Sequence, residues 1–260
     1  MNCKICGANA ENLFKAKVLN KYDVQYFRCT SCEYIFTEEP YWLEEAYKRA
    51  INISDTGILE RNIYFTKAIS VLIYFFYDKQ SLFLDYAGGY GIFTRMMRDT
   101  GFDFYWNDPY CENLFAKGFE YNSIKHNNVQ LLTAFEVFEH FINPVNEIEK
   151  TLKISKNIAF STELIPTPIP KQDEWWYFAF EHGQHVSFYT KKTLRTLASN
   201  FNLHFYNYEH LHLFTEKKLN DAMFKTIIPL NKIGLFSFVK KVLKSKTMED
   251  HLELRNKFED

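Results

Sequence analysis

The stretch Leu84-Asp85-Tyr86-Ala87-Gly88-Gly89-Tyr90-Gly91 decides the fold of this 260-residue chain. A short apolar run ends in a carboxylate, and a turn of small residues then leads into a helix-like segment over residues 92–100. Glycines suit a strand that reverses into a helix while its backbone lies against a ligand, because a Cβ would obstruct that approach. The stretch predicts an α/β fold with a nucleotide-binding turn.

Two known nucleotide-binding patterns are absent from this stretch, and their absence limits which classes of ligand the turn can bind. No Lys-Ser/Thr pair follows Gly91, so the turn is not a P-loop. The spacing Ala87-x-Gly89-x-Gly91 also departs from the dinucleotide fingerprint Gly-x-Gly-x-x-Gly. Because a carboxylate at Asp85 would repel a pyrophosphate, we expect a ligand that is not rich in phosphate.

A second acid follows at the distance that a nucleoside site needs. Residues 102–108 form an aromatic segment that predicts the next strand, and this segment ends in Asp108. The acid lies about 20 residues beyond the glycines, where α/β nucleoside sites place a carboxylate on the ribose hydroxyls. The alternative is an ordinary turn followed by a loop acid before Pro109. Together and in this order, the two motifs favour a nucleoside site.

These motifs resemble those of the class I S-adenosylmethionine-dependent methyltransferases. Their first motif, Asp/Glu-x-Gly-x-Gly-x-Gly, is similar to residues 85–91 with alanine in place of the first glycine. Residues 131–141, Leu-Leu-Thr-Ala-Phe-Glu-Val-Phe-Glu-His-Phe, resemble the fourth strand and loop of the subgroup with a Glu-x-x-Glu-His signature. The resemblance covers residues 60–215 and implies a Rossmann-like sheet with helices on both faces. It implies S-adenosylmethionine as cofactor, bound by Asp85, Ala87, Gly88, Gly89, Gly91, Asp108, Pro109, Phe135 and Glu136.

Four cysteines near the N-terminus have the spacing of a metal site. Cys3 and Cys6 form one Cys-x-x-Cys pair, and Cys29 and Cys32 form a second pair, with 22 residues (7–28) between the two pairs. Two such pairs can place four thiolates at the corners of a tetrahedron, which predicts a small zinc ribbon over residues 1–40. With all four positions filled by protein, the zinc would be structural. Disulfides are disfavoured in a reducing compartment, and a redox motif would need only one pair.

The amino-acid composition limits the fold classes and domain organisations that the chain can have. Hydrophobic residues make up 47% and the net charge is −1, which suits one sizeable α/β core plus an appendage and argues against a general nucleic-acid binder. No signal-peptide pattern begins the sequence, and the longest apolar run, residues 68–77, is too short to span a bilayer, so we expect a cytoplasmic protein. We divide the chain into the ribbon (1–40), a helical cover of the cofactor site (41–80), the core (81–215) and a helical tail (216–260). The charged end, 249–260, is expected to fray.

The segment after the fifth predicted strand has the character of a substrate lid. Ligands of open α/β sheets lie beyond the carboxyl ends of the strands, and residues 164–190 follow such an end with three prolines and many aromatics. Flat aromatic faces can stack on sugar rings or on a nucleobase. For each aromatic, packing onto the core is the open alternative. The predicted substrate contacts are Trp175, Trp176, Tyr177, Glu181 and Tyr189.

Three histidines are candidates for the base that deprotonates an acceptor. Imidazole suits this role because its ordinary pKa lies near neutrality. His182 and His185 lie in the lid, and His140 ends the Glu-x-x-Glu-His signature; a structural role is the alternative for each. A metal-dependent reaction would need a compact set of Asp, Asn and Glu ligands. Only Glu163 and Asp173 suggest themselves, so we expect metal-independent chemistry.

The acceptor is suggested by a further resemblance. Zinc knuckles ahead of such a core are similar to the deoxysugar C-methyltransferases, which act on nucleotide-linked keto sugars, although their sugar-nucleotide domain has no counterpart in residues 216–260. We therefore expect O-methylation of a sugar, sugar nucleotide or surface glycan. The alternatives are C-methylation of a nucleotide-linked keto sugar, or a non-catalytic partner of a glycosyltransferase. The basic amphipathic segment 231–246 can contact a membrane or a glycosyltransferase, or simply pack on the core.

Overall fold

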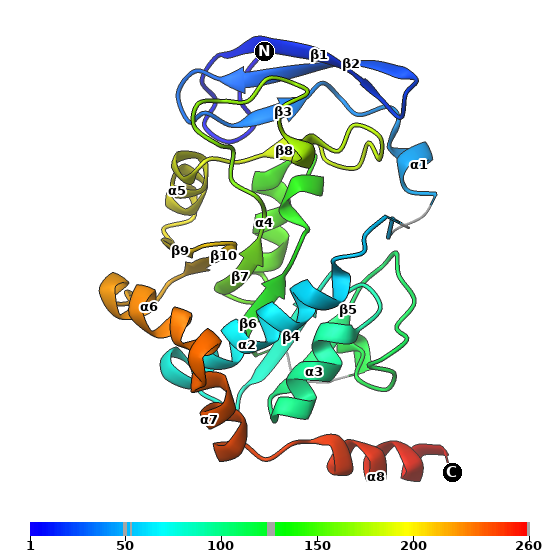
Figure 1. The fold of residues 1–260 in the computed structure, drawn as a ribbon, viewed down its shortest axis with the longest axis vertical. Coiled ribbons are helices and arrows are strands. Elements are labelled where there is room, and N and C mark those ends of the chain that lie inside the picture. Colours follow the sequence, from blue (N-terminus) through cyan, green and yellow to red (C-terminus); the bar gives the residue numbers. More distant parts are fainter. Residues whose placement is uncertain (49–50, 53, 124–127, 259–260) are drawn as a thin grey trace.

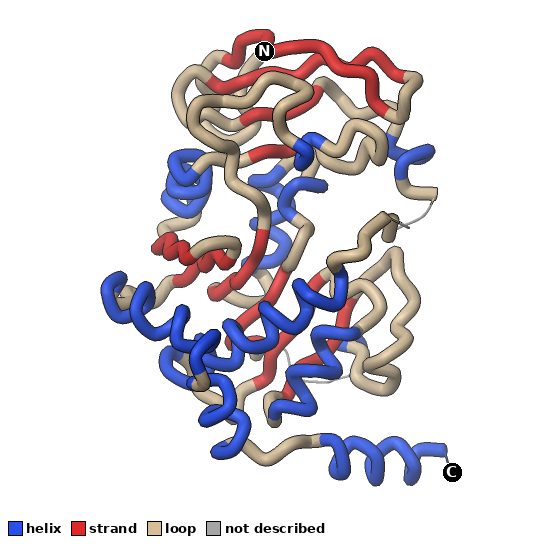
Figure 2. The backbone as a smooth tube through the Cα atoms, viewed as in Figure 1, coloured by secondary structure: helices blue, strands red, loops and turns tan. Residues whose placement is uncertain are grey.

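The computed structural model describes residues 1–48, 51–52, 54–123 and 128–258. Its strands form two sheets, one of four strands in the order β1-β2-β3-β8 and one of six in the order β5-β4-β6-β7-β10-β9. Figure 1 shows the small sheet at one end of the molecule and the larger sheet among helices at the other. The two ends also differ in content, since strands and loops dominate around the small sheet and helices dominate elsewhere (Figure 2).

The six-stranded sheet is parallel except for β10, which runs antiparallel to both of its neighbours, β7 and β9. Strand β4 pairs in parallel with β5 on one side and with β6 on the other, so the chain reverses its direction of winding at β4. Strand β7 continues the parallel set, and the hairpin β9–β10 joins it antiparallel. The crevice of an α/β sheet lies beyond the carboxyl ends at such a switch point. The strands are β4 (Leu82–Tyr86), β5 (Asp103–Asn107), β6 (Val129–Ala134), β7 (Asn157–Ser161), β9 (His204–Tyr208) and β10 (Leu211–Thr215).

Helices cover both faces of this sheet. Neighbouring strand residues point to opposite faces, so Phe83 and Leu131 belong to one apolar cluster while Leu84 and Leu132 belong to another. The first cluster includes residues of α2 (Ile58–Phe76) and α3 (Ile92–Thr100), and the second includes residues of α4 (Pro144–Leu152) and α5 (Lys191–Asn200). The predicted Rossmann-like α/β class with helices on both faces is confirmed.

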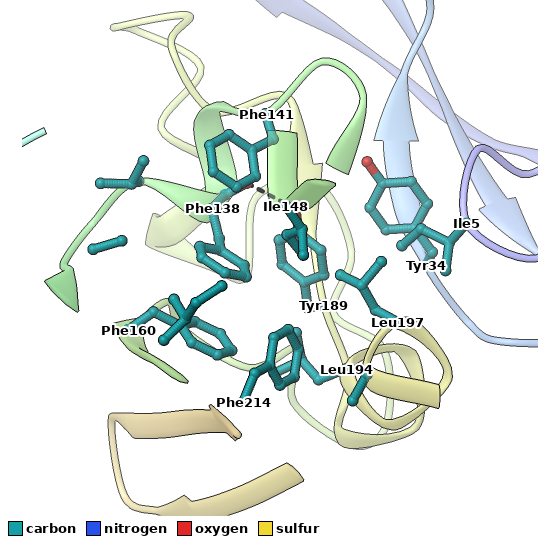
Figure 3. Close-up of a cluster of buried hydrophobic side chains, with 14 of the residues drawn as sticks. Ile5, Tyr34, Phe138, Phe141, Ile148, Phe160, Tyr189, Leu194, Leu197 and Phe214 are labelled. Atoms are coloured by element: carbon teal, nitrogen blue, oxygen red, sulfur yellow. Dashed lines mark hydrogen bonds between the residues drawn. The ribbon is translucent and has the colours of Figure 1, made fainter. Parts of the chain in front are cut away.

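The small sheet is completed by the lid segment. Strand β8 (Ser187–Phe188) pairs antiparallel with β3 (Ile35–Thr37), beside β2 (Tyr22–Cys29) and β1 (Ala10–Val18). Tyr34, next to β3, bonds through its hydroxyl to Ser187, and its ring lies 5.5 Å from that of Tyr189. Figure 3 shows these rings continuing through Phe138 to the large sheet. The N-terminal segment and the core therefore share one apolar interior.

Residues 41–80 contain two helices with different roles. The short α1 (Leu43–Ala46) lies beside the small sheet, whereas α2 packs along the large sheet through eight buried residues. Only the first turns of α2 approach the carboxyl ends of the strands, where Phe65 stacks on Phe135 with ring centroids 4.1 Å apart. Helix α2 is thus a flanking helix of the sheet whose beginning reaches the candidate site.

The C-terminal tail packs on the core. Within the segment 231–246, Val239 of α7 is buried and Phe238 contacts Tyr74 of α2, while Ile233 and Val242 are exposed. No single helix in the described part of the chain has the length and hydropathy to cross a membrane, although the bent pair 221–233 and 235–242 passes that test. The expectation that residues 249–260 fray is wrong for 249–258, which are helical. The tail comprises α6 (Asp221–Ile227), the 3-10 helix η4 (Ile228–Ile233), α7 (Leu235–Val242) and α8 (Thr247–Phe258).

Candidate functional site

The glycine turn follows β4 and is closed by the neighbouring strand. Gly88 donates its backbone N–H to the Asn107 carbonyl at 3.2 Å, and the Trp106 indole donates to the Gly89 carbonyl at 2.9 Å. A Cβ built on Gly88 would lie 2.6 Å from Asp85 Oδ2 and 2.8 Å from Trp106 Cδ1, so no larger residue fits. Ala87 itself has φ 54, the left-handed conformation that glycine adopts at less cost. The turn is a cradle built for close approach to its backbone.

Asp85 lies beneath this turn. Its side chain is buried and accepts one hydrogen bond from Thr94 and one from Thr133, each at 3.0 Å. Burial raises the pKa of Asp85 to about 7. Because both carboxylate oxygens are engaged inside the protein, the structure assigns Asp85 to holding β4, β6 and α3 in register under the turn. A direct contact with a cofactor remains a prediction.

Asp108 joins the glycine turn to the end of β5. One carboxylate oxygen accepts from Gly89 N at 2.9 Å, and the other accepts from Tyr110 N at 2.8 Å and Cys111 N at 3.0 Å. A carboxylate offers about four acceptor sites, so three backbone amides leave room for a ribose hydroxyl. The neighbouring Pro109 is exposed. The structure thus brings Asp108 against the glycine turn, as the nucleoside interpretation requires.

Phe135 and Glu136 occupy the end of β6, on the other side of β4. Phe135 lies between Phe65 of α2 and Phe93 of α3, whose ring centroid is 5.0 Å away. Glu136 has φ 54, and its Oε1 accepts from the Ser161 hydroxyl at 2.6 Å. Burial raises the pKa of Glu136, and the nearby Arg61 guanidinium opposes this shift. Both residues lie at the switch point together with the glycine turn.

The four N-terminal cysteines converge. Cys3 and Cys32 have sulfurs 3.6 Å apart, Cys6 and Cys29 have sulfurs 3.4 Å apart, and all four ligand atoms lie within 4.8 Å of one another. Zn–S bonds of ~2.3 Å in a tetrahedron separate the sulfurs by roughly 3.8 Å, so the set fits zinc. Backbone amides also donate to the sulfurs, as Ser31 N does to Cys29 at 3.3 Å.

Both cysteine knuckles dock on α5. The Cys32 carbonyl accepts from Thr193 at 2.8 Å, and the Ile5 carbonyl accepts from Asn200 at 2.9 Å. Metal bound there would therefore stabilise both the knuckles and their contact with a helix of the core. The fifth cysteine, Cys111, lies beside Asp108 and outside this group.

The three candidate histidines occupy two different environments. His140 and His185 are largely enclosed, with ring centroids 5.1 Å apart, and burial lowers their pKa values to about 4 and about 3. Both are therefore neutral and weakly basic at neutral pH. His182 is partly exposed, with Nδ1 2.5 Å from Asn52 Nδ2 and Nε2 3.1 Å from the Ser54 hydroxyl. Glu181 Oε1 lies 3.5 Å from His182 Nε2.

An open pocket begins at His182. It has an empty volume of about 550 Å³, including its mouth, between the lid, α1 and the loop that follows α1. Leu19 and Ala46 form its apolar part. Its polar lining consists of Glu45, Lys48, Asn52, Glu181 and His182.

The predicted substrate aromatics separate into buried and exposed positions. Trp175 is 8% exposed and packs on Phe178 and Phe188, whereas Trp176 is 76% exposed. Tyr177 and Tyr189 are buried, and the Tyr189 hydroxyl donates to the Phe138 carbonyl at 2.8 Å (Figure 3). For Trp175, Tyr177 and Tyr189 the structure therefore favours the core-packing alternative over substrate contact, because their rings are enclosed by the apolar interior.

One residue of the site was missed by sequence reasoning. Glu139 is buried beside His140 in the 3-10 helix η2 (Phe138–His140), and it lies with His140 and His185 in a group whose ligand atoms are within 4.8 Å of one another. The sequence-based expectation of metal ligands was confined to Asp, Asn and Glu side chains. The adjacent Glu-His pair in the signature was the available signal, but its third member is contributed by the distant lid.

Comparison with known proteins identifies the domain. A family model described as a methyltransferase domain matches residues 62–208. The plantazolicin methyltransferase BpumL, solved with a monoazolic desmethylPZN analog and SAH, has a TM-score of 0.51 at 11% identity, covering 77% of this chain and 87% of that chain. This likeness shows the fold.

Two further solved structures are more distant. Magnesium protoporphyrin IX methyltransferase from Synechocystis PCC 6803 has a TM-score of 0.41 at 7% identity, over 67% of this chain and 94% of its own. The mitomycin 7-O-methyltransferase MmcR has a TM-score of 0.42 at 11% identity, over 66% of this chain and 59% of its own. None of the three is named for a sugar substrate, and no curated protein matches the sequence.

Proposed function

This chain belongs to the methyltransferase domain family, and on that premise we propose that it transfers the methyl group of S-adenosylmethionine to a hydroxyl of a sugar, sugar nucleotide or glycan. The acceptor hydroxyl gives its proton to a base, and its oxygen attacks the methyl carbon. The carbon–sulfur bond breaks with its electron pair going to sulfur, so the products are a methyl ether and S-adenosylhomocysteine.

The cofactor proposal is supported by the switch-point geometry. Gly88 and Gly89 bring bare backbone to the carboxyl end of β4, and Asp108 holds a carboxylate against the same turn. A nucleoside bound there would lie against the turn, with its ribose hydroxyls donating to Asp108. The related fold of BpumL was solved with SAH, which is consistent with this assignment.

The acceptor proposal depends on the pocket at His182. Its polar lining carries groups of both charges, Glu45 and Glu181 against Lys48, together with the Asn52 amide. Such a mixed set can donate to and accept from many hydroxyls, and it gives no excess of positive charge for nucleic acid. Trp176, exposed in the same lid segment, offers a flat apolar face of the kind that packs on sugar rings.

Among the three histidines, His182 fits the role of base best. Transfer to an alcohol needs a group that accepts a proton near neutral pH and reaches the acceptor. The lowered pKa values of His140 and His185 make both poor bases, whereas His182 lines the pocket. Glu181 and Asn52 are placed to orient its ring.

Two measurements test the proposal. Calorimetry should show one S-adenosylmethionine bound per chain, and absence of binding would overturn the enzyme assignment. Sugar nucleotides and glycans should then be screened with a labelled methyl donor, with mass spectrometry of the product. His182→Ala should lower turnover by about 10²–10⁴-fold while cofactor affinity is retained. His204→Ala, an exposed histidine on β9, is the matched control and should leave turnover unchanged.

A further inference from the structure

Glu139 is a buried carboxylate without a partner. Its side chain is fully buried, and neither carboxylate oxygen has a hydrogen-bond partner among the described residues. The hydroxyls of Tyr177 and Thr162 lie close enough to favour its charged form, but neither reaches it with normal hydrogen-bond geometry. A buried charge of this kind costs several kcal/mol unless an opposite charge compensates it.

Nearby charges do not compensate Glu139. The carboxylate of Glu136, three residues earlier, repels it, and the Arg61 guanidinium is directed to Asp55 at 2.6 Å and toward Glu136. The Glu139 backbone is held in place, because its carbonyl accepts from Val186 N at 2.8 Å. The side chain thus extends from a fixed backbone position into surroundings with a second negative charge, that of Glu136.

Two imidazoles lie beside this carboxylate, those of His140 and His185. His140 Nδ1 lies 3.1 Å from the Gln184 carbonyl, and His185 Nδ1 lies 2.7 Å from the Tyr177 carbonyl. A carbonyl only accepts, so the contact at His185 assigns its ring proton to Nδ1 and leaves the lone pair on Nε2. His140 Nδ1 also lies 2.9 Å from the Tyr47 hydroxyl, which both donates and accepts, so its contacts are compatible with either tautomer. Backbone carbonyls behind Nδ1 are the partners that metal-binding histidines commonly use to fix ring orientation.

We propose that Glu139, His140 and His185 bind a divalent transition-metal ion. One oxygen of Glu139 and one nitrogen of each histidine lie within 4.8 Å of one another, so a small closing movement would bring all three to a common ion. Two imidazoles and one carboxylate suit Zn²⁺, Co²⁺ or Mn²⁺, and such a set leaves coordination positions open. The ion would supply the positive charge that Glu139 lacks. This proposal replaces the expectation of metal-independent chemistry.

The position of this group indicates what the open coordination would do. Glu139 and His140 follow the end of β6, next to the end of β4 that holds the glycine turn, and His185 lies three residues from His182 at the pocket. An acceptor hydroxyl that binds the ion loses its proton more readily, because the cation stabilises the alkoxide. This role rests on the proposed function, whereas binding of the ion does not.

The test is uptake of Co²⁺ by the full chain carrying zinc in its cysteine site, followed by calorimetry and visible absorption without cofactor or acceptor. We expect about one further Co²⁺ per chain, without the sulfur-to-cobalt band that thiolate ligands produce. Glu139→Gln and His185→Ala should each weaken this binding by at least about 100-fold, beyond the 10–100-fold that loss of a supporting partner costs. Glu174→Gln and His204→Ala, both at exposed positions, are matched controls and should bind as the wild type does.

Two outcomes would overturn the proposal. One is a wild-type protein that takes up no ion beyond the cysteine site, and the other is unchanged binding by both ligand variants. Circular dichroism checks that the variants are folded, and the wild-type titration decides the matter if one of them is not. Because the assay contains no S-adenosylmethionine, a failure of metal uptake is distinguishable from a failure of the proposed function.

Discussion

Arg98 and Asp250 form a bidentate ion pair in the protein interior, although 152 positions separate them in the chain. Arg98 Nε donates to Asp250 Oδ2 at 2.9 Å and Nη2 donates to Oδ1 at 2.7 Å, with both side chains at most 3% exposed. The pair attaches α8 to α3, the helix that begins at the glycine turn. Arg98 also forms an ion pair with Asp103, in which Nη1 lies 2.8 Å from Oδ1.

Breaking this pair should destabilise the protein. Asp250→Asn leaves a buried guanidinium partly uncompensated, and we expect a loss of about 3 kcal/mol in the free energy of unfolding. Urea denaturation measures it. Asp221→Asn, which removes the exposed pair with Lys225, should cost less than about 1 kcal/mol. Equal effects of the two substitutions would contradict the assignment of α8 as an integral part of the fold.

Gly88→Ala should weaken cofactor binding through sterics alone. Its Cβ would meet Asp85 Oδ2 at 2.6 Å and Trp106 Cδ1 at 2.8 Å, and both neighbours are held by hydrogen bonds. We expect the affinity for S-adenosylmethionine in calorimetry to fall by at least about tenfold, the equivalent of ~1.4 kcal/mol. Gly57→Ala is the control, since its Cβ meets only the far end of the flexible Arg61 side chain. Wild-type affinity in Gly88→Ala would argue against the turn as the cofactor cradle.

Asp85 should make stability depend on pH in a defined direction. Burial raises its folded pKa to about 7, against ~3.9 in the unfolded chain, so the folded state binds the extra proton between these values. The stabilisation from this proton is complete below pH ~4 and is lost as the pH rises to about 7. In urea titrations across this range, Asp85→Asn should remove that decline and the exposed Asp173→Asn should not. If the free energy of unfolding depended on pH in the same way in the wild type and in Asp85→Asn, this role of Asp85 would be contradicted.

The adjacent tryptophans of the lid should respond differently to truncation. Trp175→Ala removes a buried ring and should lower the free energy of unfolding by about 3–5 kcal/mol. Trp176→Ala removes an exposed ring, so stability should stay within about 0.5 kcal/mol while the KM for the acceptor rises. Thermal unfolding and steady-state kinetics separate the two effects. An unchanged KM in Trp176→Ala would remove this ring from the acceptor site.

The cysteine site should be a thiolate centre that stabilises the N-terminal segment. With Co²⁺ in place of zinc, we expect a sulfur-to-cobalt charge-transfer band, and Cys29→Ser should weaken it and lower the unfolding temperature. Cys111→Ser is the matched control, because Cys111 lies outside the four-sulfur group. The site is not a four-thiolate centre if the wild type lacks the band or if Cys29→Ser retains it at full intensity.

The parts of the fold that were predicted well from the sequence depend on the spacing of residues that are close together in the chain. The short apolar strand before Asp85, the glycine turn and the acid at Asp108 all follow from geometry within a few residues or one βαβ unit. The lid was predicted less well. Its aromatics have the same composition whether they face a ligand or the interior, so the sequence did not separate Trp176 from Trp175.

By itself, the sequence determined the α/β class, the glycine turn and the two cysteine knuckles, because strand alternation, backbone turns and ligand spacing are short-range properties of the chain. Tertiary structure alone decided that β8 completes the N-terminal sheet, that Asp250 pairs with Arg98, and that His185 meets Glu139. Each of these contacts joins residues from distant elements, and their partners are selected by packing and by the cost of an unpaired buried charge. No pattern of neighbouring residues records that selection.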